Sequence, residues 1–222
     1  MRHTEQWGEP RSTMLDSKIS SKWLFGAAAL SALGFGIVSL AVARGKTSRF
    51  DKGAKRRVHV IRIDSKHPKA LRTVALSTTP LGKWWGYVPP SLLTATRLQR
   101  QGRTVAALTV VGTAISAALL PVALDRLMKR RLPPPERQDP SKQSYPSGHA
   151  LQTSAMAVST GYVLLREGLG PRWSVAPLGL ASLAAGAGRL LLDRHWTSDV
   201  LGGYFAGVAL GATCAGVYEL RR

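Results

Sequence analysis

The chain has 222 residues, a length that normally makes one domain or one modest bundle of membrane helices and that excludes a large multidomain protein. Lysine and arginine outnumber aspartate and glutamate by 31 to 12, for a formal net charge of +19, so nucleic acid, anionic lipid or a phosphorylated substrate is the expected attraction. Cys214 is the only cysteine, which excludes an intrachain disulfide and a cysteine-based zinc site.

The chain begins with a polar N-terminal tail, residues 1–22, and continues with a first transmembrane helix, residues 23–43. The apolar stretch ends in Ala41-Val42-Ala43, a small-residue pattern of the kind that signal peptidases cut. It is bilayer-length, however, and longer than the signal-peptide core of about 7 to 15 residues. We therefore predict an uncleaved membrane anchor.

Residues 44–72 form a basic connector with eleven lysines and arginines against two aspartates. Such a charge run is either simply solvated or, beside a membrane, attracted to anionic headgroups by on the order of 1 kcal/mol per basic residue. We expect anionic membrane lipids to be partners of this connector. Nucleic acid is not an expected partner, because the chain has no zinc-finger spacing, helix-turn-helix pattern or aromatic interleaving.

The other apolar stretches lie within residues 73–222. The runs that approach the roughly 20 residues needed to cross a bilayer are 104–124, 150–165, 173–192 and 200–218. Residues 84–96 are apolar for only 13 residues and contain Pro89-Pro90, so they either span as a kinked helix or only dip into the bilayer. The sequence predicts an all-α fold, a polytopic membrane bundle of five or six transmembrane helices.

His149 lies at the boundary of one apolar run and ends the sequence Pro146-Ser147-Gly148-His149. Gly148 permits a tight turn that brings the backbone close to a ligand, and we expect a helix to begin at about His149. The free N–H groups and the positive dipole end at a helix start bind anions. These residues are candidates for contact with a phosphate group.

His195 and Asp199 are four residues apart at the start of the last apolar run, so on a helix both side chains would lie on one face. An aspartate that is hydrogen-bonded to one ring nitrogen fixes the tautomer and leaves the other nitrogen free to attack phosphorus. Taken alone, the spacing is equally typical of a hydrogen bond at a helix start.

Arginines near the same segment ends are candidate phosphate ligands. Arg189 lies in an apolar run, where it either snorkels to the interface or binds phosphate oxygens with its planar guanidinium. Arg130 and Arg137 flank Leu132-Pro133-Pro134-Pro135 and add two more candidates.

These residues resemble the motifs of the type 2 phosphatidic acid phosphatase (PAP2) superfamily, which shares an active-site plan with vanadium haloperoxidases and glucose-6-phosphatase. The family's first motif is Lys, six residues, Arg-Pro. Arg130 to Arg137 keeps this spacing, with arginine in place of lysine and Gln138 in place of proline. The second motif, Pro-Ser-Gly-His, is complete at residues 146–149.

The third motif of the superfamily is Ser-Arg, five residues, His, three residues, Asp. Arg189, His195 and Asp199 fit it, whereas Gly188 replaces the serine and removes a hydroxyl that could contact phosphate. A less efficient or differently selective enzyme is therefore one expectation. A catalytically silent lipid-binding or scaffold protein is another, because the first and third motifs are altered. A transporter or channel remains a third class, since the chain combines several spans with an intramembrane arginine.

The resemblance implies that residues 73–222 are the catalytic membrane domain and that they hydrolyse a phosphomonoester or diphosphate through a phosphohistidine. His195 would attack in line, Asp199 would orient it, and His149 would protonate the leaving oxygen and then deprotonate water. The other candidates would bind the phosphate oxygens: Arg130, Arg137, Ser147, Gly148 and Arg189.

No metal and no cofactor is expected, because arginines supply the positive charge and no carboxylate cluster in the sequence suits a cation. A site at the membrane interface favours a phosphorylated lipid as the substrate. The candidates are phosphatidate, phosphatidylglycerophosphate and a polyprenyl phosphate or diphosphate, of which we prefer the polyprenyl class.

Two arguments about which membrane face carries the site give opposite answers. With six spans, residues 44–72 lie on the catalytic side, and the positive-inside rule places both in the cytoplasm. The family's usual arrangement puts catalysis outside. If residues 84–96 do not cross, five spans reconcile the two arguments, and we expect the site on the outer face of the cell membrane.

Overall fold

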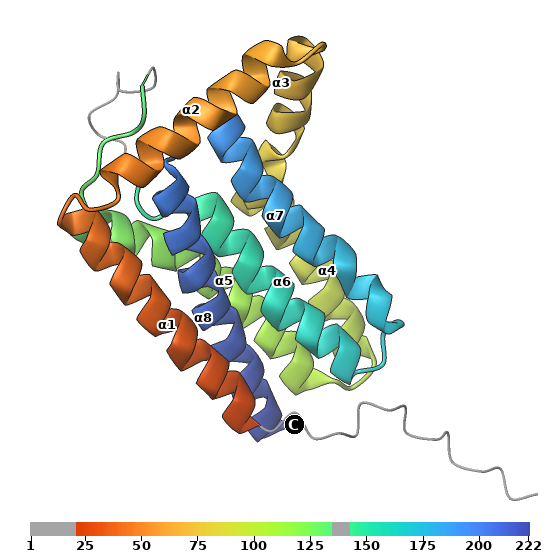
Figure 1. The fold of residues 1–222 in the computed structure, drawn as a ribbon. Helices are drawn as coiled ribbons and strands as arrows, with labels where there is room; N and C mark the ends of the chain where they lie inside the picture. The colour runs from red at the N-terminus through yellow and green to blue at the C-terminus, as the bar shows by residue number, and fades with distance from the viewer. Residues whose placement is uncertain (1–20, 135–142) are drawn as a thin grey trace, which may run out of the picture.

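A computed structural model describes residues 21–134 and 143–222, and within these ranges the chain is helical without strands (Figure 1). The predicted all-α fold is confirmed. The predicted tail lies outside the described residues except for Ser21 and Lys22, which begin α1 (Ser21–Ala43). This helix is apolar on every side and buries only Ala28 among its residues, as expected for a helix that faces lipid.

The centre of the bundle is α6 (Gly148–Arg166), which packs against α8 (Thr197–Arg221) (Figure 1). Gly203, Gly207 and Gly211 lie four residues apart on α8 and face α6. A Cβ at position 203 would come within 2.5 Å of the Ser147 carbonyl oxygen, so the two backbones approach closely only because side chains are absent. This contact holds together the two helices whose N-terminal ends carry the second and third motifs.

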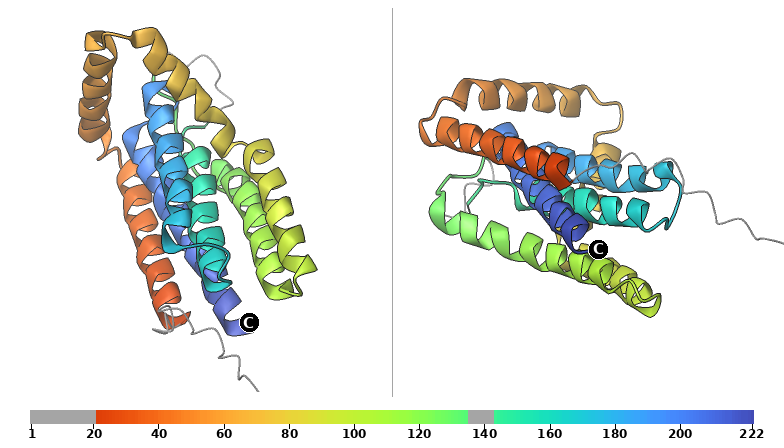
Figure 2. Two further views of the ribbon diagram at one scale, coloured as in Figure 1. Left: turned by 90° about the vertical axis from the view of Figure 1, so that its right-hand side faces the viewer. Right: turned by 90° about the horizontal axis from the view of Figure 1, so that it is seen from below.

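The other long helices surround this pair: α4 (Trp84–Arg100), α5 (Thr104–Leu127) and α7 (Ala176–Leu191), together with α1. Consecutive helices from α4 to α8 run in opposite directions through the bundle (Figures 1 and 2). The doubtful segment with Pro89-Pro90 is a continuous helix packed along α5.

Four described helical segments are long and apolar enough to cross a membrane: Ser21–Ala43, Thr104–Leu127, Arg172–Leu191 and Thr197–Arg221. The third includes a short 3-10 helix, η2 (Arg172–Val175), that precedes α7. The central α6 is less apolar because it carries Thr153, Ser154, Ser159 and Thr160, all of which are buried. These side chains face the protein interior, so hydropathy underestimates how deeply α6 lies in the bundle.

The basic connector is helical. It forms α2 (Ser48–Asp64) and α3 (Pro68–Ser77), followed by the 3-10 helix η1 (Thr79–Gly82). Helix α2 extends beyond the end of the bundle and contacts α7 and α8 there, and α3 turns back toward α7 (Figures 1 and 2). The connector and the start of α8 therefore lie at the same end of the molecule. The number of spans, five or six, and the membrane face of the catalytic loops stay predictions.

Candidate active site

The loop between α7 and α8, residues 192–196, carries His195 and is fastened to α2. Asp193 in this loop has a φ of 55°, a left-handed conformation that aspartate tolerates better than most residues. Its carboxylate accepts from Arg62 at 2.6 Å and pairs with Lys55 at 3.1 Å. Two cations of the connector thus fix the conformation of the loop that holds the predicted nucleophile.

The His195 side chain is 14% exposed, and its Nδ1 lies 2.7 Å from the carbonyl oxygen of Ser144. A carbonyl oxygen only accepts, so Nδ1 carries the proton and Nε2 keeps its lone pair. Burial lowers the pKa of the His195 imidazole to about 4, and the nearby Arg189 and Arg194 act in the same direction against the Ser144 hydrogen bond. The imidazole is therefore neutral at pH 7, the form that a nucleophile requires.

Asp199 does not make the predicted hydrogen bond to His195. The histidine lies in the loop, because α8 begins only at Thr197, so the two residues do not share a helical face. Asp199 Oδ2 is 3.9 Å from His195 Nδ1 and accepts instead from the Trp196 N–H at 2.6 Å. The carboxylate folds back on the first turn of its own helix, and the Ser144 carbonyl takes the orienting role.

Arg130 was predicted to bind phosphate, but its guanidinium joins two buried carboxylates. Nη1 donates to Asp199 Oδ1 and to Ser198 Oγ at 2.7 Å, while Nη2 donates to Asp51 Oδ2 at 2.7 Å. Both carboxylates are at most 1% exposed, so they need this cation nearby. Through these contacts Arg130 links α2 to the start of α8, and its predicted contact with phosphate stays a prediction.

Asp51, which sequence reasoning overlooked, comes from α2. Its Oδ1 accepts from the Ser198 N–H at 2.9 Å, and its Oδ2 accepts from Ser198 Oγ at 2.8 Å. The first N–H groups of a helix lack partners within that helix, and a carboxylate there is favourable. One of two aspartates among the eleven cations of the connector was the only signal in the sequence, and it does not identify the partner.

The second motif lies where the sequence predicted it. Helix α6 begins at Gly148 and is preceded by Ser147, whose N–H donates to the Asp199 carbonyl oxygen at 2.9 Å. This backbone bond ties the second motif to the third. Half-buried His149 packs tightly against Gly82 of η1, where a Cβ would overlap the imidazole. The two motifs are held as one unit.

Three predicted site residues carry buried polar atoms without a hydrogen-bond partner within the described ranges. These atoms are Ser147 Oγ, His149 Nε2 and Arg189 Nε. Buried polar groups are nearly always hydrogen-bonded, so unsatisfied atoms on three predicted ligands are places where a bound phosphate or water would complete the bonding.

A cavity of about 740 Å³ opens beside Arg189 and His195. Ser147 and His149 do not form part of its wall, and Arg137 lies outside the described residues. Its polar wall also includes cations that sequence reasoning missed. These are Lys83, Arg126 and Arg194. Lys83 precedes one apolar run and Arg126 follows another, which the sequence shows. Their convergence on one cavity depends on the fold.

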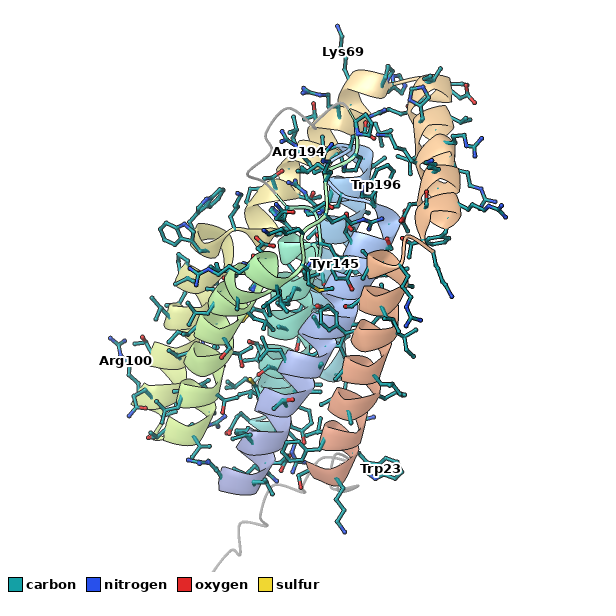
Figure 3. The ribbon with its side chains drawn as sticks, turned by 90° about the vertical axis from the view of Figure 1, so that its left-hand side faces the viewer. Trp23, Lys69, Arg100, Tyr145, Arg194 and Trp196 are labelled. Atoms are coloured by element: carbon teal, nitrogen blue, oxygen red, sulfur yellow. The ribbon has the colours of Figure 1, made fainter. Side chains whose placement is uncertain are left out.

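The apolar wall of the cavity contains Leu76, Val122, Leu132 and Leu192. Arg194 and Trp196 lie at the end of the bundle that carries Lys69 and the connector, while Trp23 and Arg100 lie at the other end (Figure 3). Within the described ranges, no group of three or more His, Cys, Asp or Glu side chains has the geometry to hold a metal ion.

A helical membrane bundle with a basic, histidine-containing cavity at one end defines the class of this protein. The model of the PAP2 superfamily matches residues 106–222, more than half of the chain, and the protein belongs to this superfamily.

Two individual proteins are similar. A lipid A 1-phosphatase of Porphyromonas gingivalis is 41% identical over 68 residues, which are 31% of this chain but only 15% of that protein. The chain therefore matches a small part of that relative's length. The crystal structure of a transmembrane PAP2-type phosphatidylglycerolphosphate phosphatase from Bacillus subtilis superposes with a TM-score of 0.75. The match covers 88% of this chain and 98% of that one at 20% identity, and it shows a shared fold.

Proposed function

We propose that the protein is a metal-independent lipid phosphatase that acts through a phosphohistidine. The observation that carries the proposal is a neutral His195, with its Nδ1 fixed by a backbone carbonyl, on the wall of a cavity lined by Arg189 and further cations. The names of the two similar proteins, both phosphatases of phosphorylated lipids, agree with this class.

In the first step, His195 Nε2 forms a bond to phosphorus while the bond between phosphorus and the leaving oxygen breaks. His149 acts in its protonated form, which the negative charge of the bound phosphate favours, and gives its proton to that oxygen. In the second step, His149 takes a proton from water, whose oxygen attacks phosphorus, and the P–N bond breaks to release inorganic phosphate and His195. Arg189, Ser147 Oγ and the Gly148 N–H stabilise the charge on the equatorial oxygens. Arg137 is proposed as a further ligand, on the family pattern alone.

The proposed substrate is a polyprenyl phosphate or diphosphate. A cavity of about 740 Å³ is far larger than one phosphate group, and its cations extend from Arg189 to Lys83 and Arg126. Several separated cations suit two linked phosphates better than one. The apolar wall, with Val122 and Leu132, suits the first part of a hydrocarbon chain. Turnover of phosphatidate in preference to polyprenyl diphosphate would contradict this choice.

We also propose that the exposed cations of α2 contact anionic lipid headgroups and that the site lies on the outer face, as the family's usual arrangement implies. The excess of lysine and arginine at the catalytic end argues for the cytoplasmic face instead. A cysteine at exposed Lys66, in a Cys214→Ser background, decides between them. Labelling of intact cells by a membrane-impermeant thiol reagent supports the outer face, and labelling only after lysis overturns it.

The decisive test is phosphate release by detergent-purified protein from phosphatidate, phosphatidylglycerophosphate and polyprenyl mono- and diphosphates, with excess chelator. Wild-type release is expected to persist in chelator, and His195→Ala is expected to lower it on the order of 10⁴-fold or more. His67→Ala, at an exposed position, is the matched control and is expected to behave as wild type. Folded protein that releases no phosphate from any lipid would favour the catalytically silent alternative.

A further inference from the structure

Position 188, where the family's third motif has a serine, has no room for a side chain in this protein. A Cβ on Gly188 would overlap Thr78 Oγ1 and would lie 3.1 Å from the Ala75 carbonyl oxygen. The Thr78 hydroxyl is itself held by that carbonyl oxygen at 2.8 Å. The corner between α3 and η1 therefore packs directly against the backbone of α7, and the glycine is what permits this approach.

The same approach brings a different hydroxyl to the neighbouring arginine. Arg189 Nη2 donates a hydrogen bond to Thr79 Oγ1, and both residues line the cavity together with His195. A hydroxyl that accepts one hydrogen bond still has its own proton to donate. Arg189 is 6% exposed, and its Nε has no partner within the described residues, so its guanidinium has a fixed position with one donor unused.

We propose that Thr79 supplies the phosphate-contacting hydroxyl of this site, in place of the serine that the family pattern has at position 188, and that it also positions Arg189. The inference rests on the proposed phosphatase function. Gly188 then does more than remove the serine hydroxyl. Because position 188 has no side chain, η1 packs close to α7, and the hydroxyl of Thr79 on η1 replaces that of the serine. The substrate phosphate would accept from Thr79 Oγ1 and from Arg189 Nε.

The first test compares three variants at two adjacent threonines. Thr79→Val keeps the side-chain shape but removes the hydroxyl, and we expect kcat/KM to fall about 10- to 100-fold. Thr79→Ser restores the hydroxyl and is expected to retain activity within about threefold of wild type. Thr78→Ala removes the neighbouring hydroxyl, which bonds to Ala75, and is the matched control with an expected loss under about threefold.

A second variant tests the exchange of hydroxyls. Gly188→Ser restores the family pattern, yet we expect it to lower kcat/KM by at least about tenfold, because the new Cβ pushes η1 and Thr79 away from Arg189. Activity equal to or above that of wild type in Gly188→Ser would overturn the inference. So would wild-type activity in Thr79→Val, or failure of Thr79→Ser to recover activity in folded protein.

Binding of inorganic phosphate gives a readout that does not need turnover. Phosphate is expected to raise the thermal unfolding temperature of wild-type protein in detergent. The phosphate concentration for half of this rise is expected to be about tenfold higher in Thr79→Val and unchanged in Thr79→Ser. Equal phosphate dependence in Thr79→Val and wild type would contradict the role of Thr79 alone. Wild-type protein that neither releases nor binds phosphate would overturn the proposed function, and this inference with it.

Discussion

The two sides of the His195 loop differ in whether their charged groups have partners within the protein. On the side that faces α2, Asp51 and Asp193 are each paired with cations from another part of the chain. On the side that faces the cavity, Arg189 Nε has no partner in the described part of the protein. Ion pairs that are complete within the protein stabilise the loop, and polar groups left without partners are available to a ligand. Changes on the two sides should therefore affect different properties.

Among the changes that compare the two sides, Arg189→Lys, on the cavity side, is expected to have the largest effect on activity. Lysine keeps the charge but loses the planar pair of donors and the contact with Thr79, so kcat/KM should fall about 100-fold. The unfolding temperature should change little, because no carboxylate of the described residues is left unpaired. Steady-state kinetics and a thermal melt measure the two effects. If Arg189→Lys greatly lowered stability but not activity, the cavity side would not differ from the α2 side in the way proposed.

Asp51→Asn, on the α2 side, is expected to lower stability more than catalysis. The change leaves Arg130 with one of its two buried carboxylates and weakens the acceptor for Ser198, which should cost about 2 to 4 kcal/mol in the free energy of unfolding. Activity should fall about tenfold through displacement of the loop. The matched control is Asp64→Asn, at the exposed end of the same helix. Equal effects of the two changes would contradict the role of Asp51.

Substitution of exposed cations on α2 should have a smaller effect that depends on lipid. With Lys52, Arg56 and Arg57 changed to glutamine, activity in vesicles that contain anionic lipid should fall severalfold relative to wild type, and activity in neutral vesicles should be unchanged. Reconstitution in both lipid mixtures measures the ratio. An equal fall in both mixtures would mean that α2 acts only by holding the loop.

The dependence on pH should be the smallest effect near neutrality. Burial disfavours the imidazolium and lowers the pKa of His195 to about 4, so the nucleophile stays neutral as the pH falls from 8 to 5. The rate of phosphoenzyme formation from p-nitrophenyl phosphate, whose leaving group needs no acid, should change less than about twofold over that range and halve near pH 4. A midpoint near 6.5 would show a solvated His195.

Features that depend on residues close together in the chain, such as the helices and their ends, could be predicted from the sequence. The apolar runs gave the helices, and Ser147-Gly148 marked the start of α6. Contacts between segments far apart in the chain could not be predicted from the sequence. The family spacing assigned Arg130 to phosphate, but Asp51 is 79 residues away and its carboxylate takes the guanidinium. Likewise, the spacing of His195 and Asp199 fitted a helix, whereas the partner of the histidine, Ser144, comes from a loop 51 residues earlier.

The contact between α6 and α8 has a consequence for the behaviour of the protein in different bilayers. The glycines of α8 and the bond from the Ser147 N–H to the Asp199 carbonyl oxygen fix the two motifs by direct backbone contact. The outer helix α1, which buries only Ala28, is the least buried of the four candidate spans. We expect a mismatch between hydrophobic length and membrane thickness to be absorbed by tilting of the helices, while the backbone contact keeps the distance between the motifs constant. We expect turnover to vary little as acyl chain length changes.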